Sequence, residues 1–186
     1  EIAESQRIIK QSLLDIYPIK KQFNAELQIP IGYQYVLQKP DFLWLKKEIT
    51  SGNSSLLIYQ LPLKTLNKKT LVQYIIKVRD SIGKYIHGTE PNTPMLTEEG
   101  YAPYFNTLTL DGKLTYETKG TWQLKNDFMS GPFINYALVD TEYNRLLVVE
   151  GFCYSPTKEK RDLMHELEAI IKSIHIKKPK FTPTKQ

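Results

Sequence analysis

The strongest hydrophobic pattern in the chain lies at residues 145–154. Apolar side chains occupy both sets of alternating positions there, Leu146, Val148 and Phe152 in one set and Leu147, Val149 and Cys153 in the other. A strand with one face in water alternates apolar and polar residues, whereas a strand covered on both faces does not. The pattern therefore predicts a strand in the middle of a sheet, and we expect the rest of the fold to pack around it.

The first third of the chain carries both helix-like and strand-like patterns. Apolar residues at helical spacing predict a helix over residues 1–17, which Pro18 should end. Shorter apolar patterns predict strands over residues 24–29, 42–49 and 55–61. Residues 33–38 fit neither pattern clearly and are left unassigned.

Two later helices are predicted. The first should be capped by Asn67 and stop at Gly88. The second should be capped by Ser155, with Pro156 as its first helical residue. Their apolar positions have identical spacing, namely Leu71, Ile75, Val78 and Ile82 in the first and Leu163, Leu167, Ile170 and Ile174 in the second.

A faint internal repeat follows from this spacing. Each helix comes after an apolar strand, and each unit begins with a tryptophan close to a lysine, at Trp44 and Lys46 and again at Trp122 and Lys125. The pattern indicates either two β-rich units, each closed by a helix, or a chance similarity, since many α+β proteins share this helix spacing.

Residues 107–126 predict a β-hairpin that turns at Asp111 and Gly112. A two-residue loop would place Leu108 and Leu110 on one face of the sheet and Leu114 and Tyr116 on the other. A loop with an odd number of residues would place these apolar side chains on one face. The hydrophobic pattern therefore favours the odd-numbered loop over the more common Asp-Gly turn.

Residues 87–106 form a long connection that contains three prolines. Loops longer than about 12–15 residues without structure of their own are uncommon in compact domains and are often functional or mobile. The segment carries Tyr101, Tyr104 and Phe105. These rings either fold back on the domain or stay partly exposed and bind a partner, because tyrosine combines apolar area with a polar tip.

Together these patterns predict one α+β domain over residues 1–175, with a largely antiparallel mixed sheet and about three main helices. Apolar residues make up 41% of the 186 residues and charged residues 24%, which is ordinary for a globular protein. Four of the 25 basic residues and no acid lie in residues 176–186, so the net charge of +5 belongs mostly to this segment. We expect it to be a flexible basic tail.

Most catalytic and cofactor sites lack a signal in this sequence. The three histidines do not form a metal-binding pair, and no Gly-x-Ser-x-Gly or glycine-rich phosphate loop is present. The body is nearly neutral and has no obvious basic and aromatic surface for nucleic acid. Cys153 lies within the apolar strand and predicts a buried, unreactive thiol. We therefore expect no metal, no cofactor and no nucleic-acid partner.

Two features remain as candidates for function. Glu150 interrupts the apolar strand, either as a carboxylate in a cleft or as a structural partner of Arg145, Lys160 or Arg161 or a strand end that reaches solvent. Phe128 and Met129 lie in a predicted turn, where they either fold under the sheet or form a recognition patch.

Several of these segments resemble the C-terminal signature of an uncharacterised lipoprotein family of Bacteroidetes, which is catalogued as a domain of unknown function. The matching segments are Trp122, residues 127–133 (DFMSGPF), residues 149–156 (VEGFCYSP), Lys160 with Arg161, and residues 167–170 (LEAI). Residues 30–33 and 42–45 are also similar, so the resemblance covers most of the chain. Ser130 stands where the family pattern has glycine. No catalytic residue is established for the family.

The resemblance implies a secreted lipoprotein held at the cell envelope, on its periplasmic face, by a lipidated N-terminal cysteine. That cysteine is absent from a chain that starts at Glu1, and we expect the targeting segment to have been removed. The sequence thus predicts a non-enzymatic envelope protein that binds another protein or an envelope component. The alternative is an enzyme of unknown class with a site near Glu150 and residues 87–106.

Overall fold

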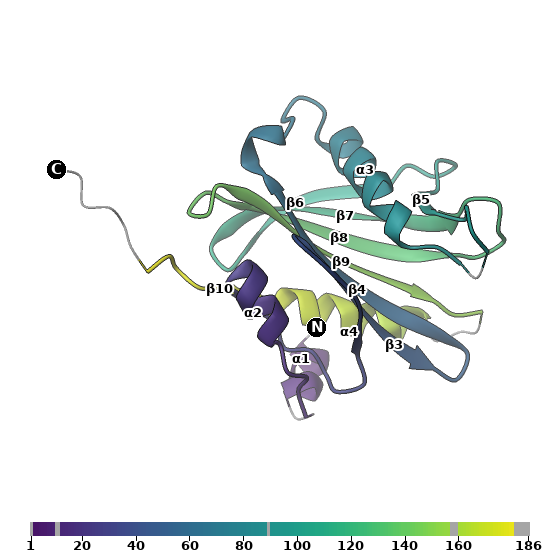
Figure 1. Cartoon of the computed structure of the whole chain (residues 1–186), viewed down its shortest axis with the longest axis horizontal. Coiled ribbons are helices and arrows are strands. Elements are labelled where there is room, and N and C mark those ends of the chain that lie inside the picture. Colours follow the sequence, from purple (N-terminus) through teal and green to yellow (C-terminus); the bar gives the residue numbers. More distant parts are fainter. Residues whose placement is uncertain (1, 10–11, 89, 157–159, 181–186) are drawn as a thin grey trace.

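An eight-stranded antiparallel sheet forms the centre of the computed structural model (Figure 1). The structure describes residues 2–9, 12–88, 90–156 and 160–180. The strands follow the order β2 (Gln34–Lys39), β3 (Phe42–Ile49), β4 (Gly52–Pro62), β9 (Arg145–Tyr154), β8 (Ser130–Asp140) and β7 (Lys113–Leu124). The outer side of β7 pairs with two strands in succession, β6 (Tyr104–Leu110) and β5 (Met95–Thr97).

Helices cover both faces of this sheet. α1 (Ile2–Ile9), α2 (Tyr17–Phe23) and α4 (Lys160–Lys172) lie on one face, together with the short pair β1 (Ala25–Glu26) and β10 (His175–Ile176). α3 (Leu71–Ile82) lies on the other face, between the short turns η1 (Leu63–Thr65) and η2 (Gly83–Tyr85). The expected α+β class is confirmed, and the helices that close the two predicted units pack on opposite faces.

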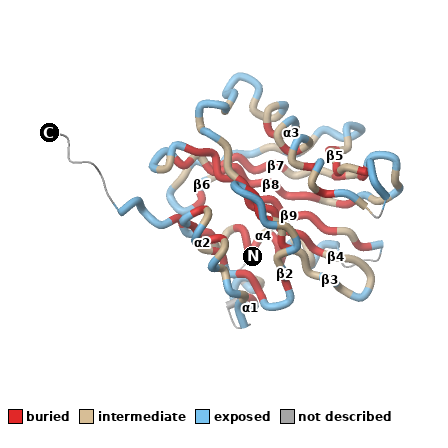
Figure 2. The backbone as a smooth tube through the Cα atoms, in the orientation of Figure 1, coloured by how far each residue is buried: buried red, intermediate tan, exposed pale blue. Residues whose placement is uncertain are grey.

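β9 is the central strand, as its apolar pattern predicts. It lies between β4 and β8, and its residues from Arg145 to Cys153 are all buried (Figure 2). Leu147, Val149 and Cys153 belong to the core under α4, whereas Leu146, Val148 and Phe152 belong to the core under α3. The burial of Cys153 is therefore confirmed, and it raises the pKa of the thiol to about 11. The low reactivity of this thiol stays a prediction.

The predicted N-terminal helix is wrong in its second half. α1 ends at Ile9, residues 10–11 lie outside the described residues, and residues 12–16 are not helical. Pro18 does not end a helix but lies in the first turn of α2. Proline is tolerated there because backbone N–H groups of the first turn have no acceptor within the helix. The unassigned residues 33–38 belong to β2.

The predicted boundaries of the two later helices also need correction. Asn67 does not cap α3; its side chain accepts a hydrogen bond from the backbone of Lys69, and the helix begins only at Leu71. α3 ends at Ile82, well before Gly88. Pro156 is not helical, and α4 is described from Lys160 onward, with residues 157–159 outside the described residues.

The register of the β6–β7 hairpin contradicts the expected odd-numbered loop. Leu110 pairs with Lys113 across a two-residue turn, in which Asp111 and Gly112 have φ values of 48° and 72°. These positive values are the ones that a type I′ hairpin turn requires. The hydrophobic argument failed because both faces of the sheet carry a core here: Leu108 and Leu110 pack toward α4, and Tyr116 packs toward α3.

Residues 87–106 are not an unstructured connection. They contain all of β5 and the beginning of β6, and both strands pair with β7. Phe105 packs against Tyr116 with 6.0 Å between ring centroids, while 79% of Tyr101 and 58% of Tyr104 are exposed. The fold therefore orders the segment mainly through sheet pairing, and it buries only one of the three rings appreciably.

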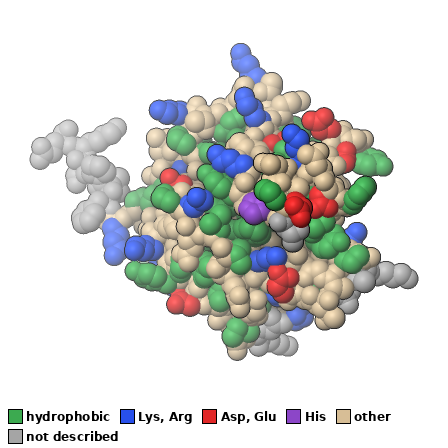
Figure 3. Space-filling model, turned by 45° about the vertical axis from the view of Figure 1, so that its right-hand side comes forward, with side chains coloured by type: hydrophobic (Ala, Val, Ile, Leu, Met, Phe, Trp, Pro, Cys, Tyr) green, Lys and Arg blue, Asp and Glu red, His purple; other side chains and the backbone are tan. Residues whose placement is uncertain are grey.

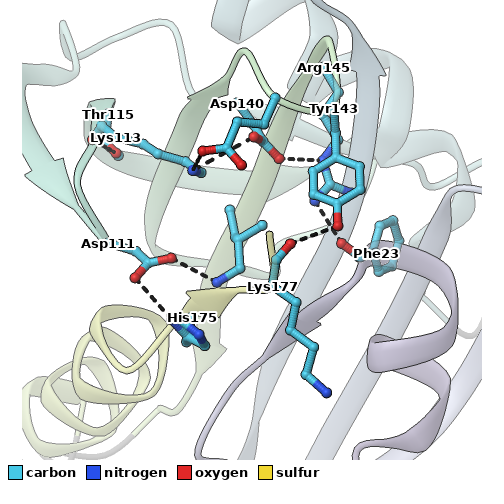
Figure 4. Close-up of polar contacts among 11 residues, drawn as sticks. Phe23, Asp111, Lys113, Thr115, Asp140, Tyr143, Arg145, His175 and Lys177 are labelled. Carbon is cyan, nitrogen blue, oxygen red and sulfur yellow. Dashed lines mark hydrogen bonds and ion pairs between the residues drawn. The ribbon is translucent and has the colours of Figure 1, made fainter. Parts of the chain in front are cut away.

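The end of the described chain is tied to the domain (Figure 4). The backbone N–H of Ile176 donates to Asp111 Oδ2 at 2.7 Å, and Tyr143 Oη donates to the carbonyl oxygen of Lys177 at 2.6 Å. The first two residues of the expected basic tail are thus part of the fold. Residues 178–180 are exposed, and residues 181–186 lie outside the described residues.

Candidate functional site

A small aromatic pocket lies on the α3 face of the sheet, at the end where β7 and β9 finish. Its volume is about 70 Å³. The lining side chains come from four strands and two loops, and they are Trp44, Lys46, Asn53, Ser55, Ile86, His87, Gly88, Trp122, Leu124, Met129, Phe152 and Tyr154. Trp44, Trp122, Met129, Phe152 and Tyr154 belong to the segments that carry the family resemblance, so these five signature residues meet at one place in the fold.

Trp122 forms the floor of the pocket. Its indole Nε1–H donates to the carbonyl oxygen of Cys153 at 3.1 Å, which ties the end of β7 to β9 across β8. The indole meets Phe152 and Tyr154 edge-on, with ring centroids 5.7 and 6.5 Å away. This edge-to-face arrangement is the favoured one for aromatic rings and holds Trp122 in a single position.

Gly131 makes room for this indole. It lies opposite Trp122 in the β7–β8 ladder. A Cβ atom on Gly131 would come within 2.2 Å of the Cys153 carbonyl oxygen and 2.9 Å of Trp122 Nε1. Because one of these neighbours is backbone, neither the strand nor the indole can yield easily, and only glycine fits between them.

Trp44 forms the opposite wall from the other half of the chain. Its Nε1–H donates to Ser55 Oγ at 3.1 Å, and Ser55 is fully buried on the neighbouring strand β4. Lys46, two residues further along β3, pairs with Glu48 at 2.7 Å. The tryptophans that mark the two halves of the faint sequence repeat therefore line the same pocket.

The segment after η2 forms the roof. The backbone N–H of Met95 donates to the carbonyl oxygen of Ile86 at 2.9 Å, and the N–H of Gly88 donates to Thr93 Oγ1 at 3.0 Å. These bonds fold the chain back on itself and hold His87 at the mouth of the pocket. The roof is therefore positioned by β5, which in turn pairs with β7.

Phe128 and Met129 lie together at the rim. The backbone N–H of Leu124 donates to the carbonyl oxygen of Met129 at 2.9 Å, which closes the turn between β7 and β8. Met129 points into the pocket, whereas the side chain of Phe128 is fully exposed. Of the two alternatives for this turn, Met129 follows the one that folds under and Phe128 the one that forms a surface patch.

The lining defines what the pocket can accept. Among the described residues that line it, aromatic and aliphatic groups dominate, Lys46 and His87 are the basic side chains, and there is no acidic one. Figure 3 brings this end of the molecule forward and shows hydrophobic side chains interspersed with charged ones. Cofactor and drug-sized sites usually measure roughly 300–1,000 Å³, so this pocket suits one inserted side chain better than a cofactor.

Glu150 lies away from this pocket, buried between the sheet and α3. Its Oε1 accepts hydrogen bonds from Arg79 Nε at 2.7 Å and from Asn135 Nδ2 at 3.0 Å. The three partners considered from the sequence are therefore wrong, as is a strand end in solvent: Arg145 instead donates to Asp140 at 2.8 Å. Glu150 is 0% exposed, so no substrate reaches it without displacement of α3.

Arg79 docks α3 onto the sheet through several contacts at once. Its guanidinium lies 3.6 Å from the centre of the Phe133 ring, and its Nη1 donates to Thr97 Oγ1 at 2.8 Å. The next helix residue, Asp80, accepts hydrogen bonds from both the backbone and the hydroxyl of Thr97. Sequence reasoning missed Arg79, although it lies four residues after Ile75 and therefore shares the buried face of the helix.

The remaining candidates do not join the pocket. Tyr104 and Phe105 lie on β6, where Tyr104 pairs with Lys119 in the middle of β7, and Tyr101 precedes them in the connection from β5. The pocket begins near Trp122, at the far end of β7. The structure thus separates the candidates into a pocket rim, a strand edge and a buried ion pair.

Neither a metal centre nor a membrane-spanning helix is found among the described residues. Within residues 2–9, 12–88, 90–156 and 160–180, no group of three or more His, Cys, Asp and Glu side chains is arranged to hold a metal ion. No helix in these ranges combines the length and hydrophobicity that a bilayer crossing needs.

The profile of a family described as a domain of unknown function, DUF4837, matches residues 12–173, and the chain therefore belongs to this family. No curated protein matches the sequence.

Solved structures share the fold. Mog1p from Saccharomyces cerevisiae, described as a Ran-binding protein, is similar with a TM-score of 0.54 and 10% identity over 90% of this chain and 95% of that chain. PsbP (CyanoP) from Synechocystis sp. PCC 6803 has a TM-score of 0.52 and 12% identity over 88% and 89%. At such low identities the likeness shows the fold alone.

The buried ion pair yields a prediction about stability. Arg79→Met or Glu150→Leu alone should each lower the free energy of unfolding by about 3–5 kcal/mol, because each leaves one charge buried without its partner. The double variant should cost much less than the sum of the two. Urea unfolding measures all three, and Glu48→Gln, which removes an exposed ion pair, is the control and should cost less than about 1 kcal/mol. Additive effects would contradict this role of the pair.

A second prediction concerns the pocket floor. Gly131→Ala should lower the free energy of unfolding by about 3 kcal/mol through steric overlap and should shift tryptophan fluorescence, since both tryptophans of the chain line the pocket. Gly112→Ala is the matched control: it has a positive φ but no atom within 4 Å of the added Cβ, so it should cost only about 1 kcal/mol and leave fluorescence unchanged. Equal effects of the two variants would show that no such close fit exists.

Proposed function

We propose that this member of the DUF4837 family is a non-catalytic binding module of the cell envelope, which holds a partner protein through the aromatic pocket. An apolar side chain of the partner enters the pocket, and Phe128 packs against the partner beside it. His87 is exposed at the mouth and can hydrogen-bond to the partner beside its apolar anchor.

The observation that carries this proposal is the fully exposed Phe128 beside a pocket of one side-chain size. Hot spots in protein interfaces are typically aromatic anchors set in such pockets, surrounded by contacts that exclude water. A phenylalanine ring left in water has no stabilising role in the fold of a monomer, whereas it contributes strongly once a partner covers it.

The chemistry of the described residues supports binding over catalysis. Glu150, the one acidic candidate from the sequence, is enclosed and neutralised by Arg79. Among its described residues the pocket brings together His87 and Lys46 but no carboxylate and no nucleophile beside a base, which are the arrangements that general acid–base or covalent catalysis uses.

Two further observations agree with protein binding at the envelope. Mog1p, which shares the fold, is described as Ran-binding, and this is support by analogy of fold only. The location rests on the resemblance of the signature segments to envelope lipoproteins. We propose that the chain works at the periplasmic face, tethered by a lipid anchor of the kind that the resemblance implies, with another envelope protein as its partner.

Phe128→Ser tests the proposal. The full chain, immobilised, captures partners from native membranes, and quantitative mass spectrometry compares the wild type with the variant. Loss of a hot-spot ring should weaken capture of the specific partner roughly thirtyfold, equivalent to about 2 kcal/mol. Stability should change by less than about 0.5 kcal/mol, because the ring is fully exposed.

Tyr17→Ser, on the opposite helical layer, is the matched control. Tyr17 is an exposed aromatic residue of α2 and lies far from the pocket in the fold, so its loss should leave capture unchanged. Equal capture by the wild type and the Phe128→Ser variant would contradict the proposed function.

A further inference from the structure

We propose that two copies of this chain associate edge to edge through β6, in antiparallel orientation, so that their sheets form one continuous sheet with its two-fold axis at Thr107. This assembly uses a different surface from the aromatic pocket and does not depend on the function proposed for it.

β6 is an open edge of the main sheet. Within the described part of the chain it pairs with β7 alone, through seven consecutive residue pairs from Tyr104–Lys119 to Leu110–Lys113. Tyr104, Asn106, Thr107 and Thr109 are exposed, so side chains on both faces of this strand reach solvent. The outer backbone groups of β6 are thus accessible to another strand.

This edge lacks the usual protection against strand addition. Natural edge strands carry charged residues, proline or β-bulges, or are very short, because an exposed row of N–H and C=O groups recruits other strands. β6 has the sequence YFNTLTL, with no charge and no proline, and its register with β7 is regular. These features leave β6 fit for pairing.

The opposite edge of the same sheet shows the contrast. β2 has a register shift between Tyr35 and Leu37, and it carries a charged residue, Lys39. β5, beyond β6 on the same edge, is only three residues long. Because the other edges are guarded or short, the unguarded β6 indicates a strand that is covered in the working protein.

The hairpin register specifies which backbone groups face outward. In a two-residue hairpin the residues that flank the turn, here Leu110 and Lys113, form a hydrogen-bonded pair. Alternate residues back along β6 then bond to β7 as well. The N–H and C=O groups of Phe105, Thr107 and Thr109 therefore point away from β7, toward an incoming strand.

These three residues lie symmetrically about Thr107, so β6 can pair with β6 of a second copy through all three at once. In an antiparallel pair of β6 strands centred on Thr107, Thr107 faces Thr107 of the second copy, and Phe105 faces Thr109. Each of the three resulting pairs exchanges two backbone hydrogen bonds, so every outward group is satisfied.

The side chains suit the same register. Thr–Thr and aromatic–β-branched pairs are among the favourable cross-strand neighbours, and these are the pairs that form at Thr107 and at Phe105 with Thr109. On the other face, Tyr104 meets Leu110 and Asn106 meets Leu108 of the second copy. Because β6 has no charged residue, self-pairing opposes no like charges within the two strands.

Cysteine cross-linking of the full chain tests the register. Thr107→Cys places two thiols opposite each other, with Cα atoms about 5.5 Å apart, a distance that a disulfide spans. Mild oxidation should convert most of this variant to a covalent dimer. The native Cys153 is buried and does not compete.

Two matched variants serve as controls. Thr109→Cys lies on the same strand, but its thiols are offset by four residues, roughly 14 Å along the strand, and should not cross-link. Gln38→Cys, on the opposite edge strand β2, should also form no intermolecular disulfide. Equal cross-linking at positions 107 and 109, or none at 107, would overturn the proposed pairing.

Mass measurement in solution tests the assembly itself. Light scattering coupled to size exclusion should give twice the 21.6-kDa chain mass for the wild type. Thr107→Pro removes an outward N–H without removing a bond to β7, and it should shift the mass to one chain while far-UV circular dichroism stays native. Gln38→Pro, its control on β2, should remain dimeric. A wild-type protein that is monomeric at 100 μM would overturn the proposal, even if a strand of another protein binds to β6.

Discussion

The ion pair between Arg79 and Glu150 is the constraint on which the arrangement of this domain depends. Both side chains are almost completely buried, and a buried charge is tolerated only when its partner and the surrounding dipoles are in place. Arg79 meets this condition with Glu150 on the central strand, the ring of Phe133, and the hydroxyl of Thr97 on β5. One guanidinium therefore fixes α3 over the sheet and fixes the path of the chain from α3 to β5, and this path forms the roof of the aromatic pocket.

The pocket itself results from a second close fit, at the end of the sheet. Gly131 leaves the space through which Trp122 reaches the backbone of β9, and Trp44 approaches from the other half of the chain. The floor and walls thus belong to the rigid sheet, while the rim carries the exposed Phe128. A rigid recess beside one exposed aromatic ring is better suited to receiving a side chain than to carrying out a reaction. A preorganised apolar surface binds its partner without a large entropic cost of ordering.

Sequence reasoning succeeded where one local pattern sufficed and failed where the answer depended on tertiary contacts. The doubly apolar pattern of residues 145–154 identified the central strand, because period-two alternation directly reports which faces are covered. The same reasoning misjudged the hairpin at Asp111, because it assumed one buried face where the sheet has two. It singled out Glu150 but did not identify Arg79 as its partner, since a pairing between residues 71 positions apart leaves no local signal in the sequence. Phe128 and Met129 were found as a pair out of place, but only the fold shows that they point in different directions.

Site-specific photo-cross-linking from the rim of the pocket shows whether Phe128 contacts a partner in the cell. The photoreactive residue p-benzoylphenylalanine, incorporated in living cells in place of Phe128, reacts only with groups within a few ångströms, so it reports contact at the pocket itself. We expect a covalent adduct with one envelope protein from position 128 and none when the same residue replaces Tyr17 on the opposite layer. Absence of an adduct at position 128, or the same adduct from both positions, would contradict the proposed function.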